Sequence, residues 1–224
     1  MKLPIGTYSL YNQLENCPHK AYHIYVLKDV PYVESPEMKW GNDVHSALEH
    51  RIADGTPLPE TMTAAEPTAA TLHRLKDRFD VHVEQKIGMS ASGEPCDFWS
   101  ADCWFRGKLD VSVINDDFKA AWLLDWKTGK VREEPFELEC QALLTKVNHP
   151  DLDLICGNYF WLQTGKEGHR YTLGDHDKVF GKLHDLRDEL ETYAEKGDWP
   201  KRKNPLCGWC PVMSCENNKS HRRK

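Results

Sequence analysis

The segments Gly107-Lys108-Leu109-Asp110 and Leu123-Leu124-Asp125-Trp126-Lys127-Thr128-Gly129 decide the fold that we predict for this chain. Each is a short apolar strand that carries a carboxylate, and side chains alternate between the two faces of a strand. Asp125 and Lys127 must therefore point to one side, while Leu124 and Trp126 point to the other. Each predicted strand has one apolar face and one charged face.

The residues between these strands predict how the strands pair. Asn115-Asp116-Asp117 is a turn sequence, and a turn between neighbouring strands is typical of an antiparallel hairpin. Such a hairpin would bring Asp110 opposite Asp125 on one face. Two carboxylates that converge beside Lys127 form a site for a hard divalent cation and for a water molecule that loses a proton.

Length, composition and charge limit the class of protein. The 224 residues suffice for one substantial core, or for one domain with a small appendage. No stretch approaches the roughly 18 apolar residues of a membrane span, and the first residues lack the apolar centre of a signal peptide. We therefore expect an intracellular, cytoplasmic protein without membrane contact. The net charge of −6 neither indicates nor excludes nucleic acid, because binding depends on a local basic strip.

Apolar spacing predicts further elements around the hairpin. Ser9 is expected to cap a first helix that ends at Cys17-Pro18, and residues 55–67 are expected to form a loop. We predict helices over 21–27, 37–53, 72–79, 139–147 and 175–197, and strands over 81–84, 155–162 and 170–173.

Polar residues on these elements have more than one interpretation. His45 lies at the edge of the apolar stripe of its helix, where a lone histidine is more often structural than a ligand. Glu84 is either an exposed residue at a strand end or part of the charged face. Gln141 and Thr145 share a helix face of the kind that ordinarily meets solvent.

The cysteines point to a metal. Cys207, Cys210 and Cys215 form a C-x2-C-x4-C tract in a polar tail, and thiols clustered outside a core oxidise readily unless a metal holds them. Cys17, beside Pro18, is the best candidate for a fourth ligand. Four thiolates suit zinc or an iron–sulfur cluster, and the three-plus-one spacing favours iron–sulfur. The remaining cysteines lie in or near predicted strands and helices, where a small buried hydrophobe is the default: Cys96, Cys103, Cys140 and Cys156.

In this order the motifs resemble the PD-(D/E)xK nucleases of the RecB/AddB type, in particular small iron–sulfur exonucleases related to CRISPR-associated RecB-like nucleases and their phage counterparts. Gly107-x2-Asp110 matches the first acidic motif of that family, and Asp125-Trp126-Lys127 matches its D/E-x-K motif. Trp40-Gly41-x3-His45 matches the metal-binding histidine of the family. The segment from Ser9 to Tyr22 matches its N-terminal signature, which includes Cys17.

Two weaker matches complete the resemblance. Glu84 falls near a glutamate often seen on the preceding strand, and Gln141 begins the Q-x3-Y motif. Thr145 stands where the family has tyrosine, which puts the DNA contact of that motif in doubt and leaves the metal site unaffected.

The resemblance implies a fold and a set of site residues. The fold would be an α/β (α+β) restriction-endonuclease-like core, a central mixed sheet flanked by helices, with the N- and C-terminal segments joined by a metal cluster. One or two Mg²⁺ or Mn²⁺ ions would be bound by the side chains of His45, Asp110 and Asp125 and by the backbone carbonyl of Trp126. Asp110, Asp125 and Lys127 would be catalytic, with Gln141 and Glu84 as DNA-binding or accessory residues. A [4Fe-4S] cluster, or structural Zn²⁺ as the alternative, would bind Cys17, Cys207, Cys210 and Cys215.

The resemblance also implies a function. Residues 1–224 would form one nuclease domain, with the nuclease core at 35–197 and the cluster subregion at 1–34 and 198–224. The activity would be metal-dependent DNA cleavage, most often by an exonuclease of recombination, repair or phage DNA processing, with DNA as the partner and a recombination or replication protein as a further option.

Several alternatives remain open at this point. One is a nucleic-acid-binding or assembly module of the same fold that does not cleave, and another is a zinc-bound regulatory protein in which Asp125 and Lys127 form a surface ion pair. Lys201-Arg202-Lys203 and residues 221–224 are either phosphate contacts or a solvated tail, and Trp209 either stacks on a base or covers the cluster.

Overall fold

The computed structural model describes residues 2–218 of the chain, which fold into two compact units. The first unit is formed by the segments up to Val33 and from Phe180 onward, and the second by Glu34–Val179. The boundary on the C-terminal side falls within α6 (His176–Lys196). No helix in the described part of the chain is long and apolar enough to cross a membrane.

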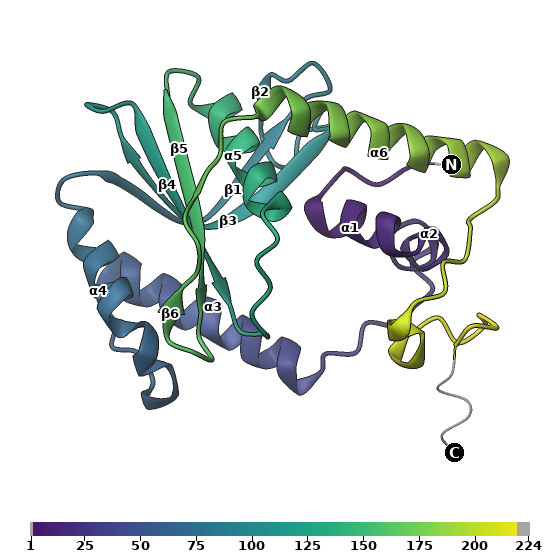
Figure 1. The fold of residues 1–224 in the computed structure, drawn as a ribbon, viewed down its shortest axis with the longest axis horizontal. Helices are drawn as coiled ribbons and strands as arrows, with labels where there is room; N and C mark the ends of the chain where they lie inside the picture. Colours follow the sequence, from purple (N-terminus) through teal and green to yellow (C-terminus); the bar gives the residue numbers. More distant parts are fainter. Residues whose placement is uncertain (1, 219–224) are drawn as a thin grey trace. The chain divides into compact units, whose positions relative to one another are not determined.

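The second unit is built on a seven-stranded mixed sheet (Figure 1). Its main path runs β2-β1-β3-β4-β5-β6, and β7 also pairs with β5. β1, β3 and β4 are antiparallel, whereas β4 and β5 are parallel because α5 carries the chain back between them. The bounds are β1 (Asp80–Met89), β2 (Pro95–Cys96), β3 (Phe105–Asn115), β4 (Ala120–Lys127), β5 (Leu154–Trp161), β6 (Lys166–Glu167) and β7 (Tyr171–Thr172). The predicted mixed sheet and its antiparallel hairpin are confirmed.

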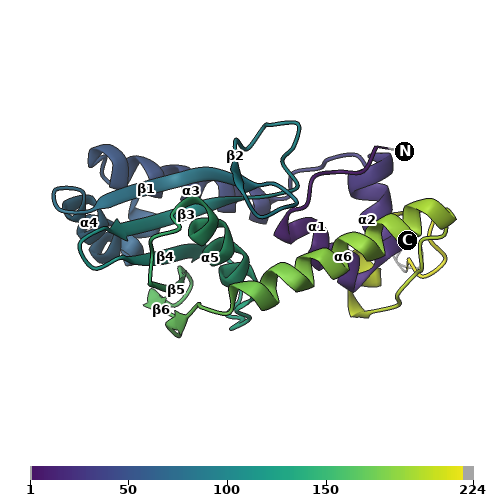
Figure 2. The ribbon, with the colours of Figure 1, turned by 90° about the horizontal axis from the view of Figure 1, so that it is seen from above.

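Helices cover both faces of this sheet. Figure 2 shows α3 (Pro36–Asp54) on one side of the strands and α5 (Phe136–Asn148) on the other. α3 begins at Ser35, whose hydroxyl accepts a hydrogen bond from the backbone N–H of Met38, and it ends at a left-handed Gly55. The apolar side of α3 packs with α4 (Glu66–Leu75) against the sheet, in a core that includes Val44, Leu48, Ile52, Ala69, Leu72, Val111, Val113, Leu124, Trp126 and Phe160.

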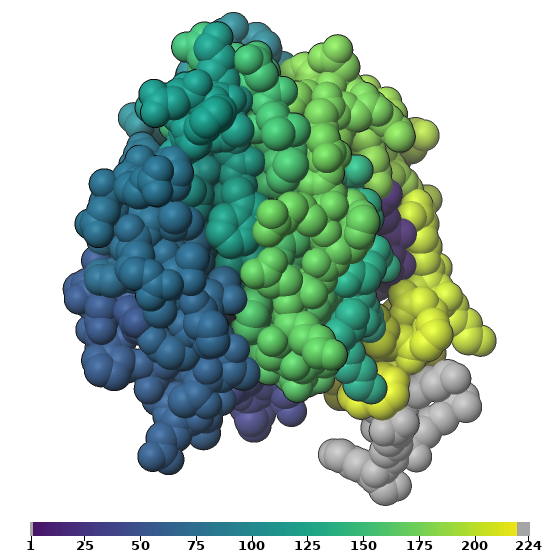
Figure 3. Space-filling view, turned by 60° about the vertical axis from the view of Figure 1, so that its left-hand side comes forward, coloured from purple at the N-terminus to yellow at the C-terminus, as the bar shows by residue number. Residues whose placement is uncertain are grey.

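The loop predicted over residues 55–67 is wrong in its second half. A 3-10 helix, η2 (Glu60–Ala65), occupies it, because Met62 and Ala65 are buried in the core beside α4. α4 then starts with Pro67 in its first turn, where the missing N–H of proline has no helical partner to lose. On the surface, this segment lies beside the turn between β5 and β6, as the adjacent blue and green regions of Figure 3 show. Gly165 of that turn packs closely on Ala64.

The first unit contains helices from both ends of the chain. They are α1 (Tyr8–Asn16), α2 (Pro18–Ala21), the π-helical turn η1 (Tyr22–Leu27), most of α6, and the 3-10 helix η3 (Pro205–Trp209). The cap predicted at Ser9 is wrong. Thr7 caps α1, because its extended backbone places Oγ1 3.1 Å from the backbone nitrogen of Leu10. The predicted break at Cys17-Pro18 is confirmed.

Contacts between the two terminal segments hold this unit together around Cys17. The backbone N–H of His19 donates to the carbonyl of Pro200 at 3.1 Å. Arg202 Nη1 donates to the carbonyl of Glu15 at 2.6 Å. The ring of Tyr22 stacks on Trp199, with centroids 4.5 Å apart. The residues on either side of Cys17 therefore contact the chain just before Cys207.

Candidate metal centre

Three side chains of the kind that bind metals converge from separate elements of the second unit. His45 comes from α3, Glu84 from β1 and Asp110 from β3, and one ligand atom of each lies within 4.8 Å of the others. His45 Nδ1 is 3.2 Å from Glu84 Oε1 and 3.3 Å from Asp110 Oδ1. Among residues 2–218 this is the one group of three or more histidine, cysteine or acidic side chains that is so close.

A distortion of β1 turns Glu84 into this group. The neighbours of Glu84 pair regularly, Val83 with Val111 and Gln85 with Leu109, so Glu84 lies across from Asp110. Its own φ of 55° is left-handed, which is strained for a residue with a side chain inside a strand, and strain of this kind clusters at functional sites. The Glu84 side chain is only 6% exposed, so the alternative of an exposed strand-end glutamate is wrong.

Asp110 also contacts the second strand of the hairpin. Val111 pairs with Leu124, and continuing this register by one residue places Asp110 opposite Asp125. Asp110 Oδ2 accepts a hydrogen bond of 2.8 Å from the backbone N–H of Trp126. Trp126 thus contacts the acidic group through its backbone N–H. The role of its backbone carbonyl as a metal ligand stays a prediction.

Lys127 and Asp125 form the other half of the candidate site. Lys127 Nζ lies 2.7 Å from Asp125 Oδ1 and 2.7 Å from Glu137 Oε2 on α5. Gln141, also on α5, donates from Nε2 to Asp125 Oδ2 at 2.9 Å. Asp125 Oδ1 is fully buried. Within residues 2–218 it forms no well-aligned hydrogen bond, so its negative charge is offset by the adjacent Lys127 ammonium group.

The polar face of α5 is turned toward the sheet. Gln141 and Thr145 are both buried, and Thr145 Oγ1 donates to the carbonyl of Gln141 at 2.8 Å. The expectation that this face meets solvent is therefore wrong. Gly107 allows the close approach of α5, because a Cβ there would lie 2.8 Å from Leu144 Cδ1.

Burial and crowding shift the protonation of the site. Burial raises the pKa of Asp125 to about 6, and the charge of Asp110 raises it as well, while Lys127 opposes both. Burial would lower the pKa of Lys127, but the carboxylates of Asp125 and Glu137 raise it. Burial would likewise lower the pKa of His45, and the hydrogen bond and charge of Asp110 reverse this. Lys127 is thus an ammonium group, suited to placing a water or a phosphate oxygen.

The residues present fit a hard divalent cation. Four carboxylates, those of Glu84, Asp110, Asp125 and Glu137, share two ammonium groups, those of Lys127 and Lys108, and a bound cation would neutralise the excess negative charge. Carboxylate oxygens and one imidazole nitrogen suit Mg²⁺ or Mn²⁺. An open hollow of about 370 Å³ gives access to the group and is lined by Asn42, His45, Ser46, Glu49, Glu84, Lys108 and Asp110.

Sequence reasoning missed two charged residues at this site. Lys108 forms an ion pair with Glu84 Oε2, and it is two residues from Asp110, a spacing at which neighbouring strand residues share a face. Glu137 binds Lys127 and lies one helical turn before Gln141, on the same side of α5. Both periodicities were present in the sequence, so these residues could have been found.

The predicted cluster cysteines lie in the first unit. Burial raises the pKa of the Cys210 thiol, and the Cys17 and Cys215 thiols add to this, while a backbone hydrogen bond at Val212 and the charge of Lys20 oppose it. The backbone N–H of Asn204 donates to Cys207 Sγ at 3.4 Å. Asn218 Nδ2 donates to the carbonyl of Cys210 at 2.8 Å and so stabilises the loop before Cys215. A metal group shared by Cys17, Cys207, Cys210 and Cys215 stays a prediction.

The remaining basic and aromatic candidates are already engaged or lie elsewhere. Lys201 pairs with Glu216 at 2.6 Å, and Arg202 pairs with Glu189 at 2.8 Å. Trp209 is largely exposed. Residues 221–224, considered above as phosphate contacts, lie outside the described residues.

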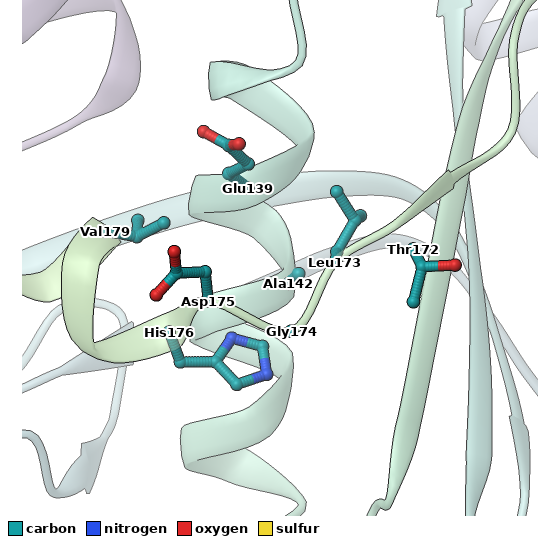
Figure 4. Close-up of a pocket in the computed structure, with 8 residues that line it drawn as sticks. All are labelled: Glu139, Ala142, Thr172, Leu173, Gly174, Asp175, His176 and Val179. Carbon is teal, nitrogen blue, oxygen red and sulfur yellow. The ribbon is translucent and has the colours of Figure 1, made fainter.

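A second, small hollow lies between α5 and the start of α6. Its volume is about 50 Å³, and its lining residues come from α5, β7 and the segment after it (Figure 4). Burial lowers the pKa of His176, and Lys146 lowers it further, so the ring in this hollow is held neutral. None of its lining residues belongs to the acidic group, so it is a separate feature.

Comparison with known proteins bears on the family and the fold of the chain. A sequence model of the PD-(D/E)XK nuclease superfamily matches residues 7–215. Among solved structures, the crystal structure of SSO0001 is similar in fold, with a TM-score of 0.51 and 15% identity, over 93% of this chain and 85% of that chain. No protein of curated function matches the chain in sequence.

Proposed function

Since the chain belongs to the PD-(D/E)XK nuclease superfamily, we propose that it is a Mg²⁺- or Mn²⁺-dependent deoxyribonuclease that hydrolyses phosphodiester bonds. The observation that carries this proposal is the convergence of His45, Glu84 and Asp110 beside the Asp125 and Lys127 pair. A module that only bound DNA would gain little from several carboxylates next to a phosphate, because they repel it.

Each residue has a role in the proposed reaction. His45, Asp110 and Asp125 would hold the metal with the carbonyl of Trp126, and Glu84, which lies beside His45, would add a carboxylate to them. A bound cation polarises the scissile phosphate and lowers the pKa of the attacking water. The Lys127 ammonium orients that water and offsets the charge that develops on the phosphate oxygens. Gln141 keeps the Asp125 carboxylate aligned through its hydrogen bond.

We further propose exonuclease action, in recombination, repair or phage DNA processing, on the strength of the RecB/AddB-type motifs. The test is digestion of end-labelled linear DNA and a covalently closed circle of the same sequence, with Mn²⁺ or Mg²⁺ and with chelator as the blank. We expect nucleotides from the linear DNA and an intact circle. Cleavage of the circle would identify an endonuclease, and no cleavage of either substrate by the metal-loaded protein would contradict the proposal.

The four cysteines Cys17, Cys207, Cys210 and Cys215 are proposed to bind a [4Fe-4S] cluster. Three cysteines in one short tract and a fourth far away in the sequence favour iron–sulfur over zinc, which more often binds two paired C-x2-C units. Protein purified without oxygen should be brown and absorb near ~400 nm. Colourless protein with stoichiometric zinc would support the structural-zinc alternative.

The two alternative functions predict other outcomes of the same measurements. A non-cleaving module would bind DNA and leave linear substrates intact at every metal concentration. A zinc-bound regulatory protein would contain zinc, lack cleavage, and lose nothing measurable when Asp110 is replaced. Metal analysis together with the digestion assay separates these from the nuclease.

A further inference from the structure

A row of basic side chains leads away from the acidic group along β1 and β3. Lys108, which lines the same hollow as Asp110, pairs across the strands with Lys86, and the next position on that side of β3 is Arg106. Arg106 and Lys86 both reach Trp99 in the loop after β2, with Cζ of Arg106 4.7 Å and Nζ of Lys86 5.9 Å from a ring centroid of Trp99. These four residues therefore share one side of the sheet.

Trp99 is held in place while its indole stays open to solvent. The side chain is 73% exposed. Phe98 meets it edge to face, with centroids 4.8 Å apart, and Arg106 lies 4.4 Å from the Phe98 centroid. Arg106 is anchored in turn, since its Nη1 donates to the carbonyl of Phe98 at 2.8 Å. The loop thus presents one aromatic face that needs no rearrangement to receive a partner.

The charge of two residues in this row is available to anions. Within residues 2–218, neither Lys86 nor Arg106 forms an ion pair with a carboxylate, whereas Lys108 pairs with Glu84, and the chain as a whole carries a net charge of −6. Two residues advance about 6.6 Å along a strand, so Asp110 and Arg106 are separated by about 13 Å, the span of a few nucleotides. Cations spaced along a line, with an aromatic ring at its far end, are the usual features of a path for single-stranded nucleic acid.

We propose that Lys108, Lys86, Arg106 and Trp99, here named the Trp99 strip, bind an unpaired DNA segment next to the scissile phosphate. Lys86 and Lys108 contact phosphates, Trp99 stacks on a base, and Arg106 is a positioning residue for Trp99. Stacking needs a base outside a duplex, so the strip selects single-stranded DNA ends. This inference rests on the proposed nuclease function for the location of the cut, and its test uses binding instead of cleavage.

The test measures the affinity of a fluorescein-labelled 20-nucleotide single strand by fluorescence anisotropy, with Ca²⁺ in place of Mg²⁺ to prevent cleavage. Trp99→Ala is expected to weaken binding about tenfold, within the range measured for loss of one base stack, while Trp99→Phe keeps most of the affinity. Lys86→Ala should reduce the slope of log affinity against log salt by about 0.7, the value for one phosphate contact on a single strand. Binding of the same sequence as a blunt duplex should change less than twofold in Trp99→Ala.

Phe118→Ala is the matched control, because Phe118 is 78% exposed in the turn at the other end of the hairpin and should leave affinity unchanged. Circular dichroism and melting of Trp99→Ala and Lys86→Ala establish that the variants are folded. The Trp99 strip proposal would be overturned if Trp99→Ala and Lys86→Ala bound the single strand as tightly as the wild type. It would also be overturned if Phe118→Ala lost as much affinity as they do. If the wild type cleaves no DNA and Trp99→Ala still loses affinity, the nuclease proposal fails and the Trp99 strip stands. If the wild type cleaves DNA and both variants bind normally, the Trp99 strip fails and the nuclease proposal stands.

Discussion

The acidic site of the second unit and the cysteine segment of the first are held in place by different means. Asp110 and Asp125 lie on paired strands, and the hydrogen bonds of the sheet bring the two carboxylates together even though they repel each other. Cys207, Cys210 and Cys215 lie in a short 3-10 helix and irregular chain, positioned by a few hydrogen bonds such as those of Asn204 and Asn218. The hydrogen bonds of a sheet can offset the repulsion between neighbouring carboxylates, whereas an irregular segment has few hydrogen bonds to do so.

This difference separates two uses of a metal. At the acidic site, a cation would relieve repulsion in a fold that exists without it, so losing a ligand should affect activity far more than stability. At the cysteine segment, a cluster would contribute free energy of folding directly, so losing a ligand should affect stability first.

The largest effect is expected at Asp110. Asp110→Asn removes one carboxylate from the metal ligands and should lower Mg²⁺-dependent cleavage by about 10³-fold or more, since a bound metal supplies several kcal/mol of transition-state stabilisation. The melting temperature should stay level or rise, because one repelling charge is gone. Single-turnover cleavage and thermal melting measure the two properties. Asp116→Asn, in the turn of the same hairpin, is the control, and equal losses in both variants would remove Asp110 from the metal centre.

The next largest effect concerns the cysteine segment. Cys17→Ser should cost the protein its ~400 nm absorbance and lower the melting temperature by roughly 10 °C, because cluster binding is coupled to folding. Absorbance spectra, iron analysis and melting report this. Cys156→Ala, at a thiol on β5, should retain full iron content. A Cys17→Ser protein with wild-type iron and melting would show that the cluster has another fourth ligand.

A moderate effect is expected from pH. The folded-state pKa of Asp125 is raised to about 6 from a usual value of 3.8, so between these values the folded protein binds a proton that the unfolded chain has released. The free energy of unfolding of the metal-free protein should therefore fall as pH rises from about 4 to 6, by about 1 to 3 kcal/mol relative to Asp125→Asn.

Urea unfolding of the two metal-free proteins between pH 4 and 8 measures this difference. Mg²⁺ should reduce it above pH 6, because a cation stabilises the ionised carboxylate. Parallel stability curves for the two proteins would mean that Asp125 titrates normally and that its burial carries no cost.

The smallest effect is expected at Lys201. Its ion pair with Glu216 is on the surface, and such pairs contribute about 0 to 1 kcal/mol. Lys201→Ala should leave the cleavage rate within twofold of wild type and change stability by less than about 1 kcal/mol. A large loss of DNA affinity in this variant would revive the phosphate-contact interpretation of Lys201-Arg202-Lys203.

Much of the framework could be predicted from sequence because it follows from local periodicity. Alternation predicted the Asp110 and Asp125 hairpin, and the apolar spacing of Val44, Leu48 and Ile52 predicted α3, both of which the structure confirms. The 3-10 helix within the segment 55–67 was missed because the prolines and threonines of that segment indicated a loop. The burial of Met62 and Ala65 depends on packing against α3 and α4, and a local sequence pattern contains no information about that packing.

The sequence by itself determined which chemistry this protein can carry: two strand carboxylates, a lysine two residues on, a histidine on an early helix, and cysteines at both ends of the chain. Only the tertiary structure decided which of these groups meet. The left-handed backbone at Glu84 turns its carboxylate toward His45, and the packing of α5 presents Glu137 to Lys127 and buries Thr145. Strand and helix periods are set by neighbours along the chain, whereas these contacts depend on groups far apart in sequence, and the free energy of packing selects them.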